Sequence, residues 1–168
     1  KTTTSFMIAK IFQSLGMDIG YLIGGISPDF SFSAKIGSDE IFVIEADEYD
    51  SAFFDKRSKF IHYSPNILLI NNIEFDHADI FNDLDEIKKQ FHHLLKIIPS
   101  SGKIILFNDD KNALDVINNG CWADIIEING DASRASFDLS SSKIKFDEHS
   151  VYINAVSYTH LRAHETSG

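Results

Sequence analysis

The chain has 168 residues, of which 43% are hydrophobic, and this is enough to bury the core of one domain. Its 15 basic and 25 acidic residues give a formal net charge of −10, which argues against a nucleic-acid or anionic-membrane surface, since both need a basic footprint. The single cysteine excludes an internal disulfide, and no apolar run reaches the roughly 20 residues of a membrane span, so we expect a cytoplasmic domain.

The first half of the sequence is predicted to form one helix and two strands. Apolar residues recur at helical spacing over Thr3–Leu15, and Gly16 follows where a helix commonly stops. Ile41–Ile44 is predicted to be a short buried strand that runs into the segment EADEYD. Asn66–Ile70 is predicted to be another strand, and it runs into NNIEFDH.

The second half continues the alternation of helices and strands. A helix is predicted over Asp83–Ile97, and Pro99 closes it. A strand over Lys103–Phe107, a helix over Lys111–Asn118 and a strand over Ile125–Ile128 follow. This alternation is typical of an α/β fold, and we expect three layers with a mostly parallel sheet flanked by helices.

The pattern changes from about Ser133 onwards. KIKFDEHSVYINA alternates polar and apolar residues, which predicts an antiparallel β-hairpin appended to the α/β body. The final stretch, SYTHLRAHETSG, has no periodicity. We therefore expect residues 1–155 to form the domain and residues 156–168 to be a non-native or disordered tail.

Candidate site residues gather at predicted strand ends. Ligands of open α/β sheets bind outside the carboxyl ends of the strands, so EADEYD and EFDHAD are expected to meet at one edge. The opening KTTT is typical of a phosphate-binding loop that enters its helix, with Lys1 on the terminal phosphates and a threonine hydroxyl on Mg²⁺. Glu45 is placed to bind that Mg²⁺ directly or through another group, and His77 to add a nitrogen ligand or hold a metal-bound water.

Each of these signals has a plain structural alternative. A lysine and threonines without preceding glycines are a weak phosphate motif, acidic loops are commonly just solvated, and His77 between two aspartates can be purely structural. The three clusters are more specific together than singly, because all lie at predicted strand ends. Their combination favours a nucleotide–magnesium site.

Several stretches resemble the central ATP-binding domain of the Mur ligases. These are KTTTS, VIEADEYDSAFFDKRSKFIHYSPNILLINNIEFDHADIF, QFHHLL and NGCW, and the resemblance covers roughly Lys1–Ile128. Within the family, FFDKRSKF and GCW are most similar to members that join UDP-N-acetylmuramate to the murein tripeptide L-Ala-γ-D-Glu-meso-diaminopimelate in peptidoglycan recycling. Two alternatives stay open: the member that adds L-alanine to the same nucleotide, and an inactive nucleotide-binding module.

The resemblance implies roles for the residues that match the family's motifs. Lys1 matches the lysine on the β- and γ-phosphates, Thr2 matches the hydroxyl that ligates Mg²⁺, and Thr3 belongs to the same nucleotide-binding segment. Glu45 matches the glutamate that binds Mg²⁺. His77 matches the histidine at a second metal position, so Lys1, Glu45 and His77 are the expected catalytic residues.

Further residues are implied at the ends of two later strands and in the basic FFDKRSK segment. Asn71 and Asn72 are expected to orient substrate or metal-bound water, and Asn108 and Asp109 to contact the ribose or base of ATP. The basic residues of FFDKRSK are candidates for contacts with anionic substrate, with a solvated basic loop as the alternative reading. These basic residues are Arg57 and Lys59.

The chain departs from the family pattern in two places. The family's phosphate loop has the form GTHGKTT, whereas this sequence begins at its lysine, and the adenine-contacting HN-x-x-N motif has no match. We therefore expect the chain to be the middle piece of a ligase whose N-terminal domain binds the UDP moiety and whose C-terminal domain brings the amino substrate. By itself it is expected not to turn over. The implied chemistry is carboxylate activation by ATP to an acyl phosphate, followed by attack of the amine.

Overall fold

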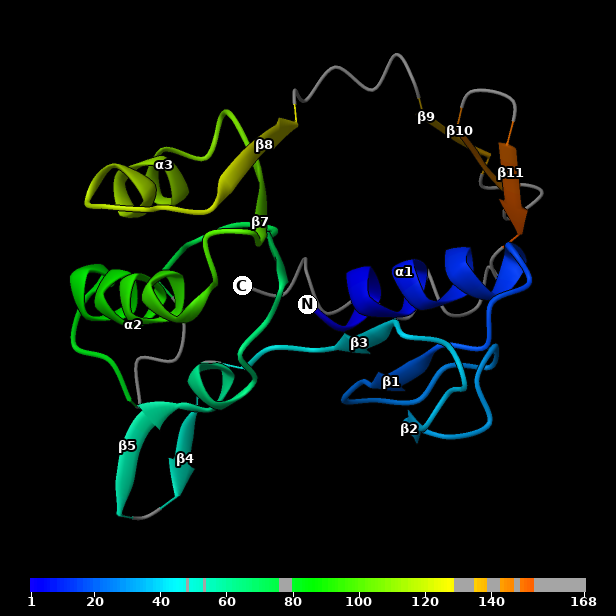
Figure 1. Ribbon diagram of the computed structural model, residues 1–168, viewed down its shortest axis with the longest axis horizontal. Coiled ribbons are helices and arrows are strands. Elements are labelled where there is room, and N and C mark those ends of the chain that lie inside the picture. The colour runs from blue at the N-terminus through cyan, green and yellow to red at the C-terminus, as the bar shows by residue number, and fades with distance from the viewer. Residues whose placement is uncertain are drawn as a thin grey trace. The chain divides into compact units, whose positions relative to one another are not determined.

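The computed structural model describes most of the chain up to residue 128 and three strands beyond it (Figure 1). The described residues are 1–47, 49–52, 54–75, 80–128, 135–138, 143–146 and 149–152. The chain divides into two compact units, Lys1–Glu45 with Asp131–Gly168 and Ala46–Gly130, each with its own hydrophobic core.

The first unit begins with helix α1, which spans Thr2–Ser14. This confirms the helix predicted over Thr3–Leu15, shifted by one residue towards the N-terminus. Gly16 has a φ of +82°, and its N–H donates to the carbonyl of Gln13 at 3.0 Å. Glycine adopts this left-handed conformation at little cost because it has no Cβ, and it commonly follows the last turn of a helix. The helix end predicted at Gly16 is therefore correct.

Three short strands form the sheet of the first unit, in the order β2-β1-β3. Strand β1 (Gly20–Leu22) pairs parallel to β3 (Phe42–Ile44) and antiparallel to β2 (Ala34–Lys35). The strand predicted over Ile41–Ile44 is thus confirmed, but its expected burial is wrong. The side chain of Phe42 is 54% exposed because its ring lies against the surface of β1 instead of entering the core.

Helix α1 is fixed to this sheet by a compact apolar core. The buried side chains are Phe6, Ala9, Ile19, Tyr21, Ile23 and Phe30. The ring of Phe30 lies 5.2 Å from that of Phe6 and 5.0 Å from that of Tyr21, measured between centroids. Tilted and edge-on aromatic contacts at these distances add to the free energy gained from burial. The core therefore holds the helix in a defined position on β1.

The C-terminal strands form an antiparallel sheet in the order β11-β10-β9. Strand β10 (Lys143–Phe146) pairs with β11 (His149–Tyr152) and with β9 (Ala135–Asp138). The predicted hairpin is therefore confirmed and extended by one strand. Residues 156–168 lie outside the described part of the chain, so the boundary at residue 155 stays a prediction.

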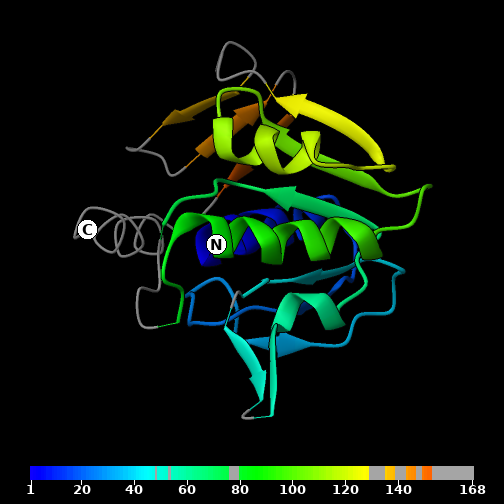
Figure 2. The same cartoon turned by 90° about the vertical axis from the view of Figure 1, so that its left-hand side faces the viewer.

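The second unit contains a parallel sheet in the order β6-β7-β8. Its strands are β6 (Ile67–Ile70), β7 (Lys103–Phe107) and β8 (Asp124–Ile128). The crossovers are α2 (Leu84–Ile97) and α3 (Lys111–Asn118), which lie on the same face of this sheet in two views (Figures 1 and 2). All five elements were predicted from the sequence, and the α/β class is confirmed.

Both crossover helices begin at an aspartate that caps their first turn. The Asp83 carboxylate accepts from the N–H of Glu86 at 2.9 Å, and the Asp110 carboxylate accepts from the N–H groups of Asn112 and Ala113 at 2.9 and 3.1 Å. Such caps stabilise a helix by about 1 kcal/mol. They satisfy N–H groups that have no partner within the helix.

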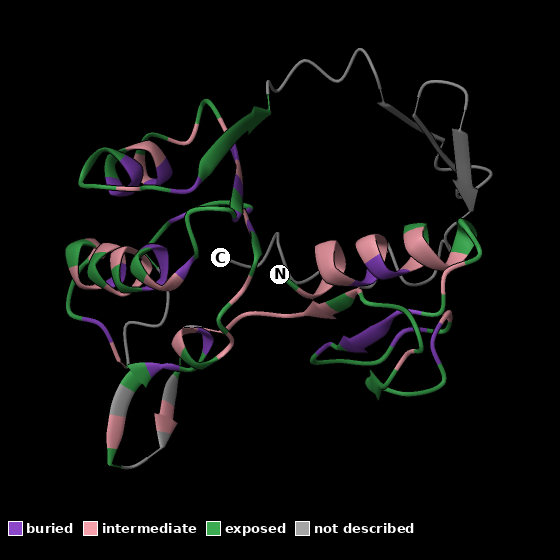
Figure 3. Cartoon of the chain, in the orientation of Figure 1, coloured by how far each residue is buried: buried purple, intermediate pink, exposed green. Residues whose placement is uncertain are grey.

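The apolar faces of α2 and α3 pack on β6 and β7, and buried positions alternate with exposed ones along both helices (Figure 3). The most deeply buried side chains of this core are Leu94, Leu95, Ile98, Ile104, Leu106 and Val116. Alternation on β7 places Ile104 and Leu106 on the face towards the helices.

The loop after α3 is tied to the end of α2 by Trp122. The indole Nε1 donates to the carbonyl of Ile98 at 3.1 Å, next to the helix terminus. A Cβ placed on Gly120 would lie 4.0 Å from Cε1 of His92, so the NGCW and QFHHLL segments are in contact. The two segments are separated in sequence by strand β7 and helix α3, and the fold of the second unit brings them together.

An antiparallel pair of strands and a short 3-10 helix precede β6 and were not predicted. Strand β4 (Asp50–Ala52) pairs with β5 (Asp55–Ser58), and the 3-10 helix η1 spans Lys59–His62. Phe60 on η1 is buried, and its ring lies 5.4 Å from that of Phe91 of α2, measured between centroids, in a tilted arrangement. In the described part of the chain, each helix is too short or too polar to cross a membrane.

Candidate active site

The opening threonine and the first predicted strand end lie side by side in the first unit. Thr2 is the first residue of α1, and Glu45 directly follows β3. The Thr2 hydroxyl donates to Oε1 of Glu45 at 2.6 Å, and the Glu45 N–H continues the parallel pairing by donating to the carbonyl of Leu22 at 2.9 Å. The structure thus brings these two predicted site residues together, because α1 packs over the β1–β3 pair.

A loop after β1 approaches the same two side chains. The N–H of Gly24 donates to Oε2 of Glu45 at 2.7 Å, so both oxygens of the carboxylate are engaged. The neighbouring Gly25 has a φ of +129°, and a Cβ built on it would lie 3.1 Å from Cγ2 of Thr2. Sequence reasoning missed this loop. The signal that could have found it is the GG pair directly after an apolar run.

The Thr2–Glu45 pair fits the requirements of Mg²⁺. Neighbouring ligands of an octahedral Mg²⁺ are about 2.9 Å apart, given metal–oxygen distances of about 2.0–2.1 Å. The observed oxygen–oxygen distance of 2.6 Å is close to this, and a hydroxyl and a carboxylate are the donors that Mg²⁺ prefers. Among the described residues, no three His, Cys, Asp or Glu side chains cluster as a metal site. Two protein ligands suffice for Mg²⁺, since it usually keeps water and substrate phosphates as its other ligands.

The start of α1 offers backbone donors for an anion. Lys1 is the N-cap residue and makes no side-chain cap bond, while its carbonyl accepts from the N–H of Ser5 at 3.1 Å. The first turn that follows consists of Thr2, Thr3 and Thr4 and contains no acidic side chain. The free N–H groups of a first turn and the helix dipole together favour a phosphate group there.

Asn71 and Asn72 follow β6 and are exposed in the second unit. The side-chain amide of Asn72 donates to Glu74 at 2.8 Å, and that of Asn71 reaches Asn72 at 3.4 Å. Their loop is held at Ile73, whose N–H donates to Asp110 at 2.8 Å.

Asn108 and Asp109 follow β7, and both are exposed. The N–H of Asn108 donates to the carbonyl of Ile128 at 3.1 Å. The register places Ile70 beside Leu106, so the two asparagines after β6 and the pair after β7 leave the same edge of the parallel sheet. His77 lies outside the described residues. The roles of all these residues, and the predicted meeting of the two strand-end clusters, stay predictions.

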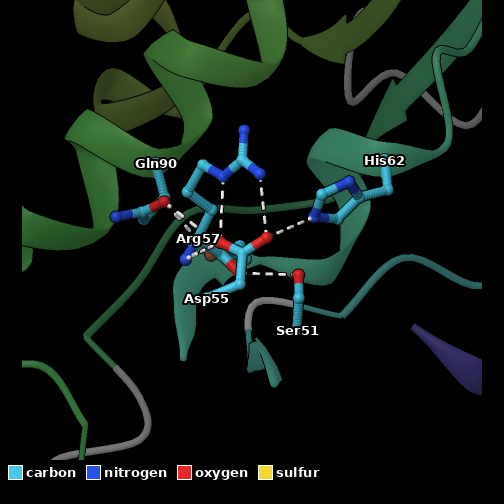
Figure 4. A network of polar contacts seen from close by, with 6 residues as sticks. Ser51, Asp55, Arg57, His62 and Gln90 are labelled. Atoms are coloured by element: carbon cyan, nitrogen blue, oxygen red, sulfur yellow. Dashed lines mark hydrogen bonds and ion pairs between the residues drawn. The ribbon is translucent and has the colours of Figure 1, made fainter. Parts of the chain in front are cut away.

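Arg57 belongs to a polar network on β5 and η1 (Figure 4). Its guanidinium makes a two-pronged contact with the Asp55 carboxylate, at 2.9 and 2.8 Å, and Nε2 of His62 lies 3.1 Å from the same carboxylate. The guanidinium holds the pKa of Asp55 well below its usual range, and the carboxylate in turn raises the pKa of Arg57. Lys59 is exposed, and its N–H donates to the carbonyl of Tyr49 at 2.9 Å. Sequence reasoning missed Asp55 as the partner of Arg57.

A family model described as the Mur ligase middle domain matches residues 1–166. A UDP-N-acetylmuramate–L-alanyl-γ-D-glutamyl-meso-2,6-diaminoheptandioate ligase from Escherichia coli (strain K12) is 53% identical over 124 residues, which are 74% of this chain and 27% of that protein. The ligase of the same name from Haemophilus influenzae is 50% identical over 123 residues, again 27% of that protein. A UDP-N-acetylmuramate–L-alanine ligase from Clostridium botulinum is 32% identical over 149 residues, 88% of this chain and 30% of that protein.

Solved structures agree with these matches. The crystal structure of a UDP-N-acetylmuramate:L-alanyl-γ-D-glutamyl-meso-diaminopimelate ligase from Neisseria meningitides is 37% identical, with a TM-score of 0.73 over 89% of this chain and 50% of that one. A murein peptide ligase from Psychrobacter arcticus is 38% identical, with a TM-score of 0.67 over 89% of this chain and 35% of that one. These likenesses confirm the predicted three-layer α/β fold class. The chain spans about a quarter of the length of the two curated relatives at 50% identity or more.

Proposed function

Because the chain belongs to the Mur ligase family, as its middle domain, we propose that it is the ATP-binding part of an ATP-dependent amide ligase. The observation that carries the proposal is the 2.6 Å contact between the hydroxyl of Thr2 and the carboxylate of Glu45 at the start of α1. A hydroxyl, a carboxylate and a helix N-terminus are three elements that together can bind a magnesium–triphosphate complex. The proposal places the reaction in the cytoplasm, where ATP is available.

The residues of this chain divide the work of binding and positioning. The N–H groups of the first turn of α1 and the ammonium of Lys1 hold the β- and γ-phosphates of ATP. Thr2 and Glu45 would hold Mg²⁺, with His77 at a second metal position. When bound, the metal supplies positive charge that offsets the charge on the transferring phosphoryl group. Catalysis then rests on holding the γ-phosphate in line with the attacking carboxylate oxygen.

The reaction that follows from this placement has two chemical steps. A carboxylate oxygen of UDP-N-acetylmuramate attacks the γ-phosphorus of ATP, the bond to the β-phosphate oxygen breaks, and ADP leaves. The amine of the second substrate then attacks the acyl phosphate carbon. The tetrahedral intermediate collapses with loss of phosphate and of the amine proton, which leaves an amide. Neither step needs a group that changes its oxidation state.

Relatives at 50% and 53% identity support the murein tripeptide as the second substrate, whereas the L-alanine-adding relative is 32% identical. We infer that Asn71 and Asn72 orient substrate or metal-bound water, and that Asn108 and Asp109 contact the ribose or base. The remaining domains of the same protein would bind the UDP moiety and bring the tripeptide. Arg57 can serve as an anion contact only if a substrate carboxylate or phosphate competes with Asp55 for its guanidinium.

Magnesium-dependent ATP binding tests the site in the full-length protein that carries this chain. Calorimetry should show that Glu45→Gln weakens binding of Mg·ATP by at least about 10-fold, because the variant loses a charged ligand and even the loss of groups that only orient metal ligands costs about 10- to 100-fold. Glu40→Gln is the matched control, since it removes the same charge from an exposed position of the same unit and should bind as the wild type. An absence of Mg·ATP binding by the wild type would support an inactive module and overturn the proposal.

Product formation tests the substrate. We expect the full-length protein to release phosphate when ATP, UDP-N-acetylmuramate and the tripeptide are all present. Phosphate release should be much lower when L-alanine replaces the tripeptide. Preference for L-alanine would reassign the chain to the other branch of the family. The isolated chain, given the same substrates, should release no phosphate.

A further inference from the structure

The loop after β1 lies against both oxygen ligands of the proposed metal site. We propose that Gly24 and Gly25 are positioning residues that set the Thr2 hydroxyl and the Glu45 carboxylate for Mg²⁺, an inference that rests on the proposed function. Neither glycine would touch the metal or the nucleotide. Their role follows from a backbone hydrogen bond and from the space that a missing side chain leaves.

Gly24 fixes the rotation of the Glu45 carboxylate. Its N–H donates to Oε2 at 2.7 Å, which leaves Oε1 turned towards the Thr2 hydroxyl. Hydrogen bonds to an ionised carboxylate are roughly twice as strong as those between neutral groups. The carboxylate is attached to a strand end and would otherwise rotate about its terminal torsion, which has a broad energy minimum. The N–H therefore orders a ligand before the metal arrives.

Gly25 provides the space that the Thr2 side chain needs. A Cβ on Gly25 would lie 3.1 Å from Cγ2 of Thr2 and 4.0 Å from Cε2 of Phe6, and Phe6 is buried in the core. The methyl and the hydroxyl of Thr2 share one Cβ, so a push on the methyl rotates the hydroxyl away from Glu45. Any side chain at position 25 thus acts on the hydroxyl through the methyl. The φ of +129° adds backbone strain for any residue other than glycine.

This geometry leads to a test by rescue in the full-length protein. Gly25→Ala is expected to weaken Mg·ATP binding by roughly 10- to 100-fold, the usual cost of disturbing groups that orient metal ligands. Thr2→Ser keeps the hydroxyl and lacks the methyl that the new Cβ meets. The double variant Thr2→Ser/Gly25→Ala should therefore bind Mg·ATP nearly as well as Thr2→Ser alone. Calorimetry with Mg·ATP, and with ATP in the presence of EDTA, measures the magnesium-dependent part.

Gly16→Ala is the matched control for backbone strain. Gly16 also has a positive φ, +82°, but a Cβ there would meet nothing within 4 Å. This variant should lower the melting temperature and leave the affinity for Mg·ATP unchanged. If Gly25→Ala yields little folded protein, recovery of folding in the double variant supports the contact with Thr2, and no recovery overturns it.

The outcomes separate this inference from the proposed function. Wild-type protein that binds Mg·ATP, with Gly25→Ala binding equally well, would overturn only the positioning role. A double variant as weak as Gly25→Ala would do the same, because the loss would then come from backbone strain alone. A failure of the wild-type protein to bind Mg·ATP would overturn the proposed function and this inference together.

Discussion

Asp110 ties two segments of the second unit together, and its removal should destabilise the fold more than the loss of an ordinary helix cap. Its carboxylate accepts from Asn112 and Ala113 in the first turn of α3 and also from the N–H of Ile73, at 2.8 Å, in the loop after β6. The side-chain amide of Asn112 donates to the carbonyl of Ile73 at 2.8 Å, which closes the link from the other side.

The magnitude follows from the groups that Asp110→Ala leaves without an acceptor. Loss of the cap costs about 1 kcal/mol of unfolding free energy. Ile73 is 3% exposed, and a buried N–H without an acceptor costs about 1–3 kcal/mol more. We therefore expect a total loss of about 2–4 kcal/mol. Asp83→Ala is the matched control, since Asp83 caps only α2 and its removal should cost about 1 kcal/mol.

Urea unfolding followed by far-ultraviolet circular dichroism measures both variants, and amide hydrogen exchange locates the effect. The exchange of the Ile73 amide should accelerate in Asp110→Ala and stay unchanged in Asp83→Ala. Equal destabilisation by the two variants, with the Ile73 amide still protected, would refute the reasoning. Asp110→Asn separates the parts: its side-chain oxygen can keep the α3 cap, while its NH₂ group faces the Ile73 donor.

Two further predictions concern the Asp55–Arg57 pair and the core. The pKa of Asp55 is lowered in the folded protein, so its stabilisation is present above its unfolded pKa of about 3.9 and is lost as pH falls. Arg57→Gln should therefore lower the free energy of unfolding at pH 7, and the difference from the wild type should vanish in strong acid. Urea unfolding midpoints measured at a series of acidic pH values test this. A difference between the two proteins that stays constant with pH would contradict it. Leu94→Ala, at 1% exposure, should cost about 2–5 kcal/mol in urea unfolding, whereas Ile26→Ala, at 98% exposure, should change stability by less than about 0.5 kcal/mol.

The elements that the sequence predicted best are those whose signals are local. Helix α2 has a capping aspartate at Asp83, apolar residues at helical spacing and a proline beyond its end, and these signals lie within one short segment. Strands β6 and β7 are short, mostly apolar runs in which every second residue is buried on the face covered by the helices. Such signals do not depend on distant partners.

The features that sequence reasoning missed depend on distant partners or on backbone atoms. Strands β1 and β2 are only three and two residues long and are defined by pairing with each other and with β3. The contact of Gly24 with Glu45 is made by a backbone N–H, which no residue type reveals. The proximity of Thr2 and Glu45 was predicted because Thr2 was placed at a helix start and Glu45 at a strand end. Ligands of open α/β sheets bind outside the carboxyl ends of the strands, where such residues meet.

The position of Trp122 makes it a natural optical probe of one half of the molecule. It is the sole tryptophan in the sequence and belongs to the unit Ala46–Gly130, where its indole is bonded to the end of α2. Emission excited at the red edge of indole absorption therefore reports the environment of that unit. Unfolding curves of this chain recorded in this way follow the second unit without any engineered label.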